Sequence, residues 1–498
     1  MNTREETLDP QDWTELRELG HRMLDDMLDY LQTVRERPVW KPLPKELTQE
    51  FDKPLPVEPE GIEQAYNDFV EHVLPYPLGN IHPRFWSWVC GTGTPGGMLA
   101  EMLAAGMNSG VHGAAQSAVK VEQQVLNWCK EIMGFPASAS GILVTGGSMA
   151  NLVGLTVARN AKSGTDVNQH GMQSVRQPLT FYCSAQTHNS VHKAIGLLGL
   201  GRDSLREIRV NERFEIDIAA LSATIEHDRR NGLRPVCVIG NAGTVNTGAV
   251  DDLNAIAEIC AREDMWFHVD GAFGALISLS PALRPLISGL ERADSLAFDF
   301  HKWMYTQYDA GCALIRSEKA HHESFRVPSS YLSHFERGVA SGDTWFGEYG
   351  VELSRSFRAL RIWMSIKEHG IDKYRRMIEQ NVAQARYLVG LIKLNPELEL
   401  MAPAPLNIVC FRYHPAGLEE EELDGLNKEI LFQLQEQGIA APSSTVLNGS
   451  FAIRVAISNH RSRVEDLNVL AGEVCRIGRE LTHGGAVQTL QDMFCPAD

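Results

Sequence analysis

The chain has 498 residues, of which 44% are hydrophobic and 22% charged, and its formal net charge is −17. This length predicts two or three domains in one globular subunit with a substantial apolar core. The negative charge argues against nonspecific binding to nucleic acid or to an anionic membrane surface, because both would repel the chain.

The cysteines and the N-terminus indicate the compartment. Nine cysteines are scattered without C-x-x-C spacing, which predicts reduced thiols rather than a disulfide framework or a zinc site. The first ten residues are acidic and polar, and no apolar run approaches the roughly 20 residues of a membrane span. We therefore expect a cytoplasmic protein that has no membrane partner.

Residues 1–81 are predicted to form a helical arm. Apolar residues recur at helical spacing from Gln11 to Arg37, a proline-rich extended stretch follows, and a second helix is predicted over Gly61 to Val73. Two helices and an extended stretch cannot enclose a core of their own. The arm is therefore expected to pack on the main domain or on a second subunit.

A glycine-rich stretch, Gly91-Thr-Gly93-Thr-Pro-Gly96, fits the dinucleotide pattern G-x-G-x-x-G. That pattern requires a preceding βα strand and an acidic residue about 20 positions later. Here the preceding segment is rich in tryptophan, and residues 111–119 contain no carboxylate. The sequence therefore disfavours a nicotinamide-binding site.

Strands and helices alternate from there to about Arg316, which predicts an α/β domain over residues 82–370 with a mostly parallel sheet and helices on both faces. Helices are predicted over Leu353 to Lys367 and Tyr374 to Leu394. The remainder alternates strand and helix and predicts a small α+β domain over residues 371–498. The predicted strands of the large domain are 141–145, 179–183, 235–239, 265–269, 295–298 and 311–315.

The stretch Ser295 to Met304 carries the first chemical signal, because an apolar run ends at Lys302 between His301 and Trp303. Poor solvation by aromatic neighbours favours the neutral amine, which can attack a carbonyl carbon and form a Schiff base. Most lysines beside an aromatic residue only lay their stem over it. Lys302 alone is therefore weak evidence.

Asp270 strengthens the case because it follows the apolar run Met265 to Val269. Strand, helix-length connection and strand form a βαβ unit, which brings Asp270 and Lys302 to one edge of a parallel sheet. Pyridoxal phosphate needs a lysine for its aldehyde and a carboxylate that keeps its ring nitrogen protonated. The pair predicts pyridoxal phosphate as the cofactor.

A phosphate site is predicted at the strand–turn–helix stretch Gly141 to Leu155. Gly146 and Gly147 allow close approach to free N–H groups at the positive end of a helix, and Ser148 adds a hydroxyl. The same turn is also consistent with plain helix capping.

Together these stretches resemble the group II pyridoxal-phosphate-dependent amino acid decarboxylases, most closely the aromatic-L-amino-acid decarboxylases. The resemblance extends from Asp12 to Leu481. It implies a fold-type I pyridoxal-phosphate enzyme, an amino acid substrate, and a homodimer with active sites at the subunit interface and an arm that wraps the second subunit. The motifs are H-P-R-F-W from His82, T-G-G-S-M-A-N-L from Thr145, S-A-Q-T-H-N-S-V-H-K-A from Ser184, H-V-D-G-A from His268, F-H-K-W from Phe300 and S-S-Y-L from Ser329.

The resemblance implies further cofactor contacts. His188 would stack on the cofactor ring, Ala272 would support its opposite face, and Thr244 would donate a hydrogen bond, although a plain turn threonine is an alternative. His301 is also assigned to cofactor binding. His188 and His192 are four residues apart, but no glutamate or third ligand completes a metal motif, so no metal is predicted.

Residues 317–350 interrupt the apolar pattern and are interpreted as a mobile lid. The lid contains Tyr331, which in the resembling family returns a proton to the substrate carbon, here together with His188. Relatives with phenylalanine there form aldehydes, so the tyrosine favours simple decarboxylation. A surface tyrosine without a role is the alternative.

The resemblance assigns Phe85 and Arg84 to the substrate pocket. Arg84 and Gly113 replace residues that are usually aromatic, and Asp299 replaces a common asparagine. An arginine in the pocket could pair with a substrate carboxylate, and Arg454 could do the same or form an ordinary ion pair. An aromatic substrate is favoured on overall resemblance; the alternatives are an acidic or other amino acid, an aldehyde synthase, and a non-catalytic pyridoxal-phosphate-binding protein.

Overall fold

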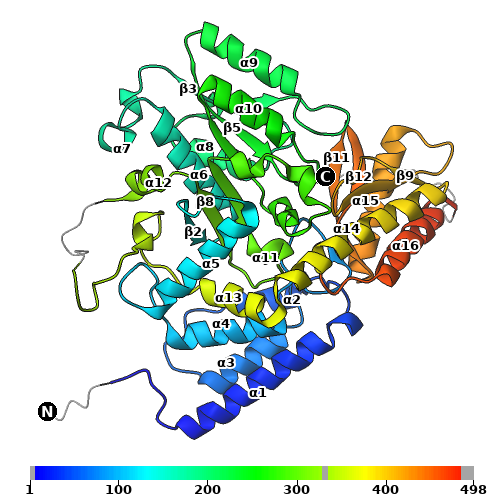
Figure 1. Cartoon of the computed structure of the whole chain (residues 1–498). Coiled ribbons are helices and arrows are strands. Elements are labelled where there is room, and N and C mark those ends of the chain that lie inside the picture. The colour runs from blue at the N-terminus through cyan, green and yellow to red at the C-terminus, as the bar shows by residue number, and fades with distance from the viewer. Residues whose placement is uncertain (1–5, 328–334, 484–498) are drawn as a thin grey trace.

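The computed structural model describes residues 6–327 and 335–483 and contains two β-sheets (Figure 1). The strands of the larger sheet are β2 (Ser140–Val144), β3 (Leu179–Ser184), β4 (Leu205–Ile208), β5 (Arg234–Asn241), β6 (Trp266–Asp270), β7 (Ser295–Asp299) and β8 (Gly311–Ile315). Those of the smaller sheet are β1 (Phe85–Trp86), β9 (Leu398–Leu400), β10 (Ile408–Tyr413), β11 (Ala441–Leu447) and β12 (Ser450–Ala456).

Helices surround both sheets and form the N-terminal arm. Before the larger sheet and within it lie α1 (Trp13–Gln32), α2 (Lys45–Thr48), α3 (Ile62–Asp68), α4 (Pro95–Met107), α5 (Ser117–Met133), α6 (Gly147–Lys162), α7 (Val167–His170), α8 (Asn189–Leu197), α9 (Ile218–Arg230), α10 (Leu253–Glu263) and α11 (Phe300–Trp303). After the larger sheet follow α12 (Glu318–Phe325), α13 (Ala359–His369), α14 (Ile371–Leu394), α15 (Glu420–Glu436) and α16 (Val464–His483).

The larger sheet has the strand order β2-β8-β7-β6-β5-β3-β4. The predicted mostly parallel sheet is confirmed, with β8 antiparallel to both of its neighbours. A parallel return needs a long crossover, whereas only the short helix α11 and a loop separate β7 from β8. The sequence analysis did not anticipate β4, which pairs with β3 at the sheet edge.

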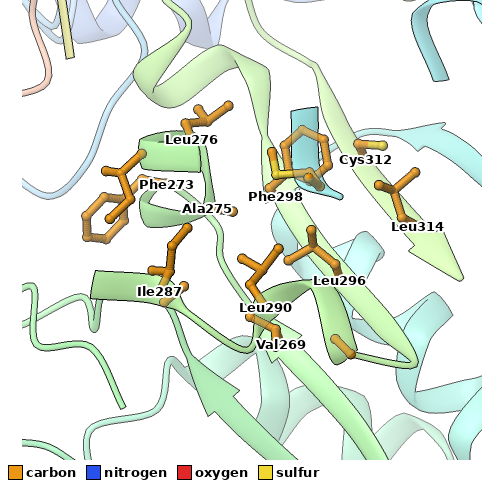
Figure 2. Close-up of a cluster of buried hydrophobic side chains, with 14 of the residues drawn as sticks. Val269, Phe273, Ala275, Leu276, Ile287, Leu290, Leu296, Phe298, Cys312 and Leu314 are labelled. Carbon is orange, nitrogen blue, oxygen red and sulfur yellow. The ribbon is translucent and has the colours of Figure 1, made fainter. Parts of the chain in front are cut away.

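Alternating side chains along the strands form two apolar layers. One layer packs against α6 and α8, and the other against α5, α9 and α10, so helices cover both faces as predicted. Figure 2 shows part of the second layer, in which side chains of β6, β7 and β8 face apolar residues of the 3₁₀ turns after β6. The labelled residues are Val269, Phe273, Ala275, Leu276, Ile287, Leu290, Leu296, Phe298, Cys312 and Leu314.

The smaller sheet joins two distant parts of the chain. Its order is β1-β11-β12-β10-β9, with Phe85 aligned to Ala441 and Trp86 to Pro442. Phe85 and Trp86 therefore belong to the smaller sheet, although the boundary predicted after residue 81 assigns them to the large domain. β11 was missed because its proline, two serines and threonine resemble a loop.

The N-terminal arm forms a helix pair that is attached to the smaller domain. Arg22 of α1 contacts Glu63 of α3 at 3.1 Å, and the two helices lie together below α4 in Figure 1. Beyond α1, Arg35 pairs with Asp466 at 2.8 Å, and the N–H of Val39 donates to the carbonyl of Gly438.

Two predicted boundaries were wrong. The segment 317–350 is not irregular throughout, because Glu318–Phe325 form α12, which packs against α6 with His321 buried. The helix predicted from Leu353 begins only at Ala359. No helix among the described residues is long and apolar enough to cross a bilayer.

Candidate active site

The carboxyl ends of the parallel strands meet at a cavity of about 220 Å³. The segments after β3, β5, β6 and β7 line it, as expected for ligand sites at this edge of an open α/β sheet. Trp88 and Val89, which follow β1, form another wall. The lining residues are Trp88, Val89, His188, Asn241, Gly243, Thr244, Val245, Asp270, Ala272, Phe273 and Lys302.

Lys302 lies on α11, and its Nζ is 2.9 Å from Oδ2 of the buried Asp299. Burial of the ammonium lowers the pKa of Lys302, but attraction by Asp299 and Asp270 and the hydrogen bond to Asp299 outweigh burial, so the pKa is raised. The expectation that aromatic neighbours keep the amine neutral was wrong. The adjacent carboxylate decides its charge.

Asp270 is buried at the end of β6 and lines the same cavity as Lys302. Its Oδ2 accepts a hydrogen bond from Asn151 Nδ2 at 2.9 Å, and its Oδ1 accepts one from the N–H of Ala272 at 3.1 Å. The structure thus brings together the carboxylate and the lysine that the sequence analysis paired.

His188 caps the start of α8 and lines the cavity. Its Nδ1 accepts the N–H of Ser190 at 3.2 Å and lies 2.9 Å from Ser190 Oγ. Burial lowers the pKa of His188, although the charge of Asp270 acts in the opposite direction. The imidazole is therefore neutral at neutral pH.

Thr244 and Asn241 follow β5. Thr244 lines the cavity. Its Oγ1 also accepts the N–H of Ala249 at 3.1 Å, so Thr244 stabilises the local turn as well, as the alternative interpretation expected. Asn241 was not anticipated; its amide donates to Asp251 and to Thr187.

The start of α6 lies beside Asp299 and His301. A Cβ added at Gly147 would lie 2.8 Å from Asp299 Oδ2, so a larger residue here would displace that carboxylate. Ser148 is exposed in the first turn, where N–H groups lack intrahelical partners. His301 is buried, accepts the N–H of Ala310 at 3.2 Å, and lies 3.8 Å from Asp299.

The substrate contacts predicted for Phe85 and Arg84 are not seen within this chain. Phe85 packs against Val39 and Ala441, because its strand pairs with β11. The carbonyl of Arg84 accepts the N–H of Ala441 at 3.0 Å, and neither residue lines the cavity. Trp88 takes that place, with a left-handed backbone at φ 53°.

Arg454 fastens this wall to the larger sheet. Its guanidinium donates to the carbonyls of Val245 at 2.8 Å and Trp88 at 2.9 Å, and to Ser443 Oγ at 3.1 Å. Burial lowers its pKa to about 10. Among the described residues its recorded acceptors are carbonyls and a hydroxyl, so the ion pair predicted for it is not formed.

Other sequence predictions lie elsewhere or outside the described residues. The indole of Trp345 covers Gly113, where an added Cβ would lie 2.4 Å from the ring. Gly91 allows the carbonyl of His301 to approach, since a Cβ there would be 2.2 Å from that oxygen. Tyr331 lies outside the described residues, so its role and the lid stay predictions.

The cavity fits pyridoxal phosphate. A lysine amine and a carboxylate share it, a glycine-started helix lies beside it, and buried Asp299 Oδ1 has no hydrogen-bond partner among the described residues. The model for the pyridoxal-dependent decarboxylase conserved domain matches residues 44–414. The chain belongs to the pyridoxal-dependent decarboxylase family.

Known proteins resemble this decarboxylase over nearly its full length. An aromatic-L-amino-acid decarboxylase of Bacillus atrophaeus is 34% identical over 474 residues, which cover 94% of this chain and 96% of that protein. A phenylacetaldehyde synthase of Arabidopsis thaliana is 28% identical, covering 90% and 93%. A crystal structure of Oryza sativa TDC with PLP and tryptamine superposes with a TM-score of 0.88, at 26% identity and 95% and 100% coverage.

Sequence reasoning missed Trp88, Val89, Asn241 and Asn151. Asn151 lies in the quoted T-G-G-S-M-A-N-L motif, so a signal was present, but its partner Asp270 is remote in sequence. The position of Trp88 depends on the pairing of β1 with β11, for which a two-residue strand gives no pattern.

Proposed function

We propose that this pyridoxal-phosphate-dependent decarboxylase converts an aromatic L-amino acid to the amine and carbon dioxide. The observation that carries the proposal is that Lys302 and Asp270 line one cavity with apolar walls. Trp88, Val89 and Phe273 supply those walls.

Each residue has a distinct task in this proposal. When bound, pyridoxal phosphate supplies a conjugated ring that accepts the electron pair left as the Cα–carboxylate bond breaks. Lys302 would hold the cofactor covalently, and the carboxylate of Asp270 would keep positive charge on the ring nitrogen. His188 and Ala272 would face the two sides of the ring.

The remaining roles concern the phosphate and the final proton. Gly147 and Ser148 would present N–H groups and a hydroxyl to the phosphate. His301 would help to fix that group, and Thr244 would hydrogen-bond the cofactor. Tyr331, together with His188, would return a proton to Cα; its role rests on the family resemblance.

The cavity lining favours an aromatic substrate over an acidic one. Among the described residues that line it, Lys302 is the only lysine or arginine. Indole, phenyl and branched aliphatic side chains form favourable apolar contacts with an aromatic side chain. A side-chain carboxylate would find no other cation among the described residues that line the cavity once Lys302 is engaged.

Aldehyde formation is the second candidate, because a relative is a phenylacetaldehyde synthase. Tyr331 argues against it, since aldehyde-forming relatives tend to carry phenylalanine at the matching position. The two reactions differ in their products: an amine in one case, and aldehyde, ammonia and hydrogen peroxide in the other.

We further propose a cytoplasmic homodimer with active sites at the subunit interface, in which the arm wraps the second copy. The exposed apolar residues of the arm support this, because a solvated arm would not favour them. They include Trp13, Leu28, Leu43, Phe51, Leu55, Val57, Ile62, Val70 and Val73. Light scattering should report a mass near twice 55.3 kDa; a monomer would refute the dimer.

A carbon dioxide release screen tests the function. The purified protein is incubated with pyridoxal phosphate and each common amino acid, dopa or 5-hydroxytryptophan, with Lys302→Ala as the blank. We expect release from aromatic amino acids with stoichiometric amine. Release only from glutamate or aspartate would overturn the aromatic proposal, and peroxide with aldehyde would favour the second candidate. Binding without any turnover would support the non-catalytic alternative.

A further inference from the structure

A chain of buried hydrogen bonds runs beneath the cavity from Trp266 toward Asp270. Trp266 Nε1 lies 2.7 Å from Ser295 Oγ, and Ser295 Oγ lies 2.7 Å from His268 Nδ1. His268 Nε2 lies 2.9 Å from Asn151 Oδ1, and Asn151 Nδ2 lies 2.9 Å from Asp270 Oδ2. All five residues are buried.

The direction of these bonds is determined at Asp270. A carboxylate can only accept, so the NH₂ group of Asn151 faces Asp270 and its Oδ1 faces His268. The N–H on Nε2 of His268 therefore donates to Asn151 Oδ1, and in a neutral ring Nδ1 is then an acceptor. Ser295 donates its hydroxyl to Nδ1, and its Oγ accepts the indole N–H of Trp266.

Asn151 also connects this chain of hydrogen bonds to His188. With its Oδ1 engaged by His268, its NH₂ group faces Asp270 and also donates to Ser190 Oγ at 3.0 Å. Ser190 then donates its hydroxyl proton to His188 Nδ1 at 2.9 Å. One branch thus ends on the carboxylate of Asp270 and the other on the imidazole of His188.

We propose that Trp266, Ser295, His268 and Asn151 are positioning residues that set the hydrogen-bond polarity of Asp270 and His188. If the relay were reversed, Asn151 would turn its oxygen toward the carboxylate, and two acceptors would face one another. The relay therefore keeps a donor on Asp270, and together with the backbone N–H of Ser190 it keeps the remaining N–H of neutral His188 on Nε2. The proposal deepens the proposed function and rests on it for its kinetic readout.

Gly154 and burial support the relay independently. A Cβ at Gly154, in the middle of α6, would lie 2.7 Å from both Cε1 and Nδ1 of His268 and 3.2 Å from Ser295 Oγ. Glycine weakens a helix interior, and here it leaves room for the imidazole. Burial lowers the pKa of His268 to about 4, so the ring is neutral, as the relay requires.

The test compares holoenzyme variants that break the relay at different points. Ser295→Ala removes one oxygen, His268→Leu removes both ring nitrogens, and His268→Gln keeps an N–H group toward Asn151. Three quantities are measured: kcat and KM for the best substrate, the ¹⁵N signal of labelled cofactor ring nitrogen, and the thermal unfolding midpoint. The nitrogen signal reports protonation of the ring and does not require turnover.

A second buried histidine supplies the matched control. His321 is fully buried, lies 2.8 Å from Ser140 Oγ through Nδ1, and lies 2.7 Å from the carbonyl of Tyr349 through Nε2. It repeats the serine–histidine–oxygen arrangement without leading to Asp270. His321→Leu therefore makes the same replacement at an equally buried histidine that has no path to Asp270.

We expect His268→Leu and Ser295→Ala to lower kcat by about tenfold to hundredfold with a smaller change in KM, and to shift the ring-nitrogen signal toward the unprotonated form. His268→Gln should recover most of both. His321→Leu should lower the unfolding midpoint alone. An unchanged nitrogen signal in Ser295→Ala, or an equal kcat loss in His321→Leu, would overturn the relay. A wild-type chain without decarboxylation would instead refute the proposed function, and the nitrogen signal would still decide the relay.

Discussion

The two sides of the cavity are built differently. On one side, Asp270 ends a strand of the larger sheet, and Lys302 and Thr244 follow the two strands that pair with it. On the other side, Trp88 is 56% exposed and follows β1, which belongs to the smaller sheet. The residues proposed to act in the chemistry thus come from neighbouring paired strands of one sheet. The position of the Trp88 wall depends instead on how the two sheets pack against each other.

The difference predicts which properties a mutation changes. A left-handed backbone at a non-glycine residue costs about 1–2 kcal/mol, so Trp88 needs external support. Arg454 supplies it through hydrogen bonds to carbonyls on both sides of the cavity. Changes to Lys302 or Asp270, on the sheet side of the cavity, should therefore affect kcat. Changes to Trp88 or Arg454, on the wall side, should affect KM.

The largest expected effect is that of Lys302→Ala, which removes the covalent attachment point. Carbon dioxide release should fall by more than about 10³-fold, and the absorbance of covalently held cofactor should disappear. Lys193→Ala, on the exposed surface of α8, is the control and should retain full activity. Substantial turnover by Lys302→Ala would contradict the roles proposed for Lys302, Asp270 and Thr244.

Asp270→Asn should have the next largest effect, because it replaces a charged acceptor with an amide of the same shape. We expect kcat to fall by about 10²- to 10³-fold while covalent cofactor binding persists. Asp228→Asn provides a comparison, since Asp228 is also buried but pairs with Arg206 at 2.9 Å away from the cavity. That variant should lose stability and keep kcat; equal kcat losses in both would refute the role of Asp270.

Trp88→Ala sharpens the comparison on the wall side. Loss of the indole should raise KM for an aromatic amino acid by about tenfold, with kcat changed less, and should leave a small aliphatic amino acid unaffected. Steady-state kinetics with both substrates measure this. A loss confined to kcat would mean that the wall takes part in the chemistry.

Arg454→Lys should act more weakly in the same direction. A lysine keeps the charge but cannot span the carbonyls of Val245 and Trp88 as the guanidinium fork does. We expect KM to rise by about threefold, and Trp88→Ala combined with Arg454→Lys to add little, because both act on one wall. Fully additive effects in the double variant would show that Arg454 acts elsewhere.

Mild acid should have the smallest effect on turnover. It should instead lower the free energy of unfolding, through His82 and His268 alike. Burial, aided by Arg84, lowers the pKa of His82, which precedes β1, to about 4, and burial lowers that of His268 to about 4. Between pH 4 and 6.5 the unfolded chain binds more protons at these sites, so the free energy of unfolding falls as pH falls. Each histidine contributes up to about 1.4 kcal/mol per pH unit. Denaturant unfolding at several pH values gives the free energy of unfolding of wild type and of His82→Asn. This free energy should change less steeply with pH in the variant. An identical pH dependence in both proteins would contradict the pKa shift of His82.

The sequence alone determined the larger sheet except for its edge strand β4, and most of the sheet side of the cavity. Apolar runs that end in Asp270, Thr244 and Lys302 are local patterns, and parallel connections bring the ends of such runs to one edge. The motifs around Gly147 and His188 were readable for the same reason. The charge of Lys302 was not, because its neighbour Asp299 was considered only as a phosphate-site residue.

Only the tertiary structure decided the wall and the relay. Trp88 lines the cavity and Phe85 does not, because β1 pairs with a strand that is formed about 350 residues later, and such pairing depends on packing between the two sheets. Arg454 donates to main-chain carbonyls, and every residue has one, so no sequence pattern predicts which residues accept its hydrogen bonds. His268, Asn151 and Ser295 meet because α6 crosses β6 and β7 at Gly154, a contact that three-dimensional packing creates.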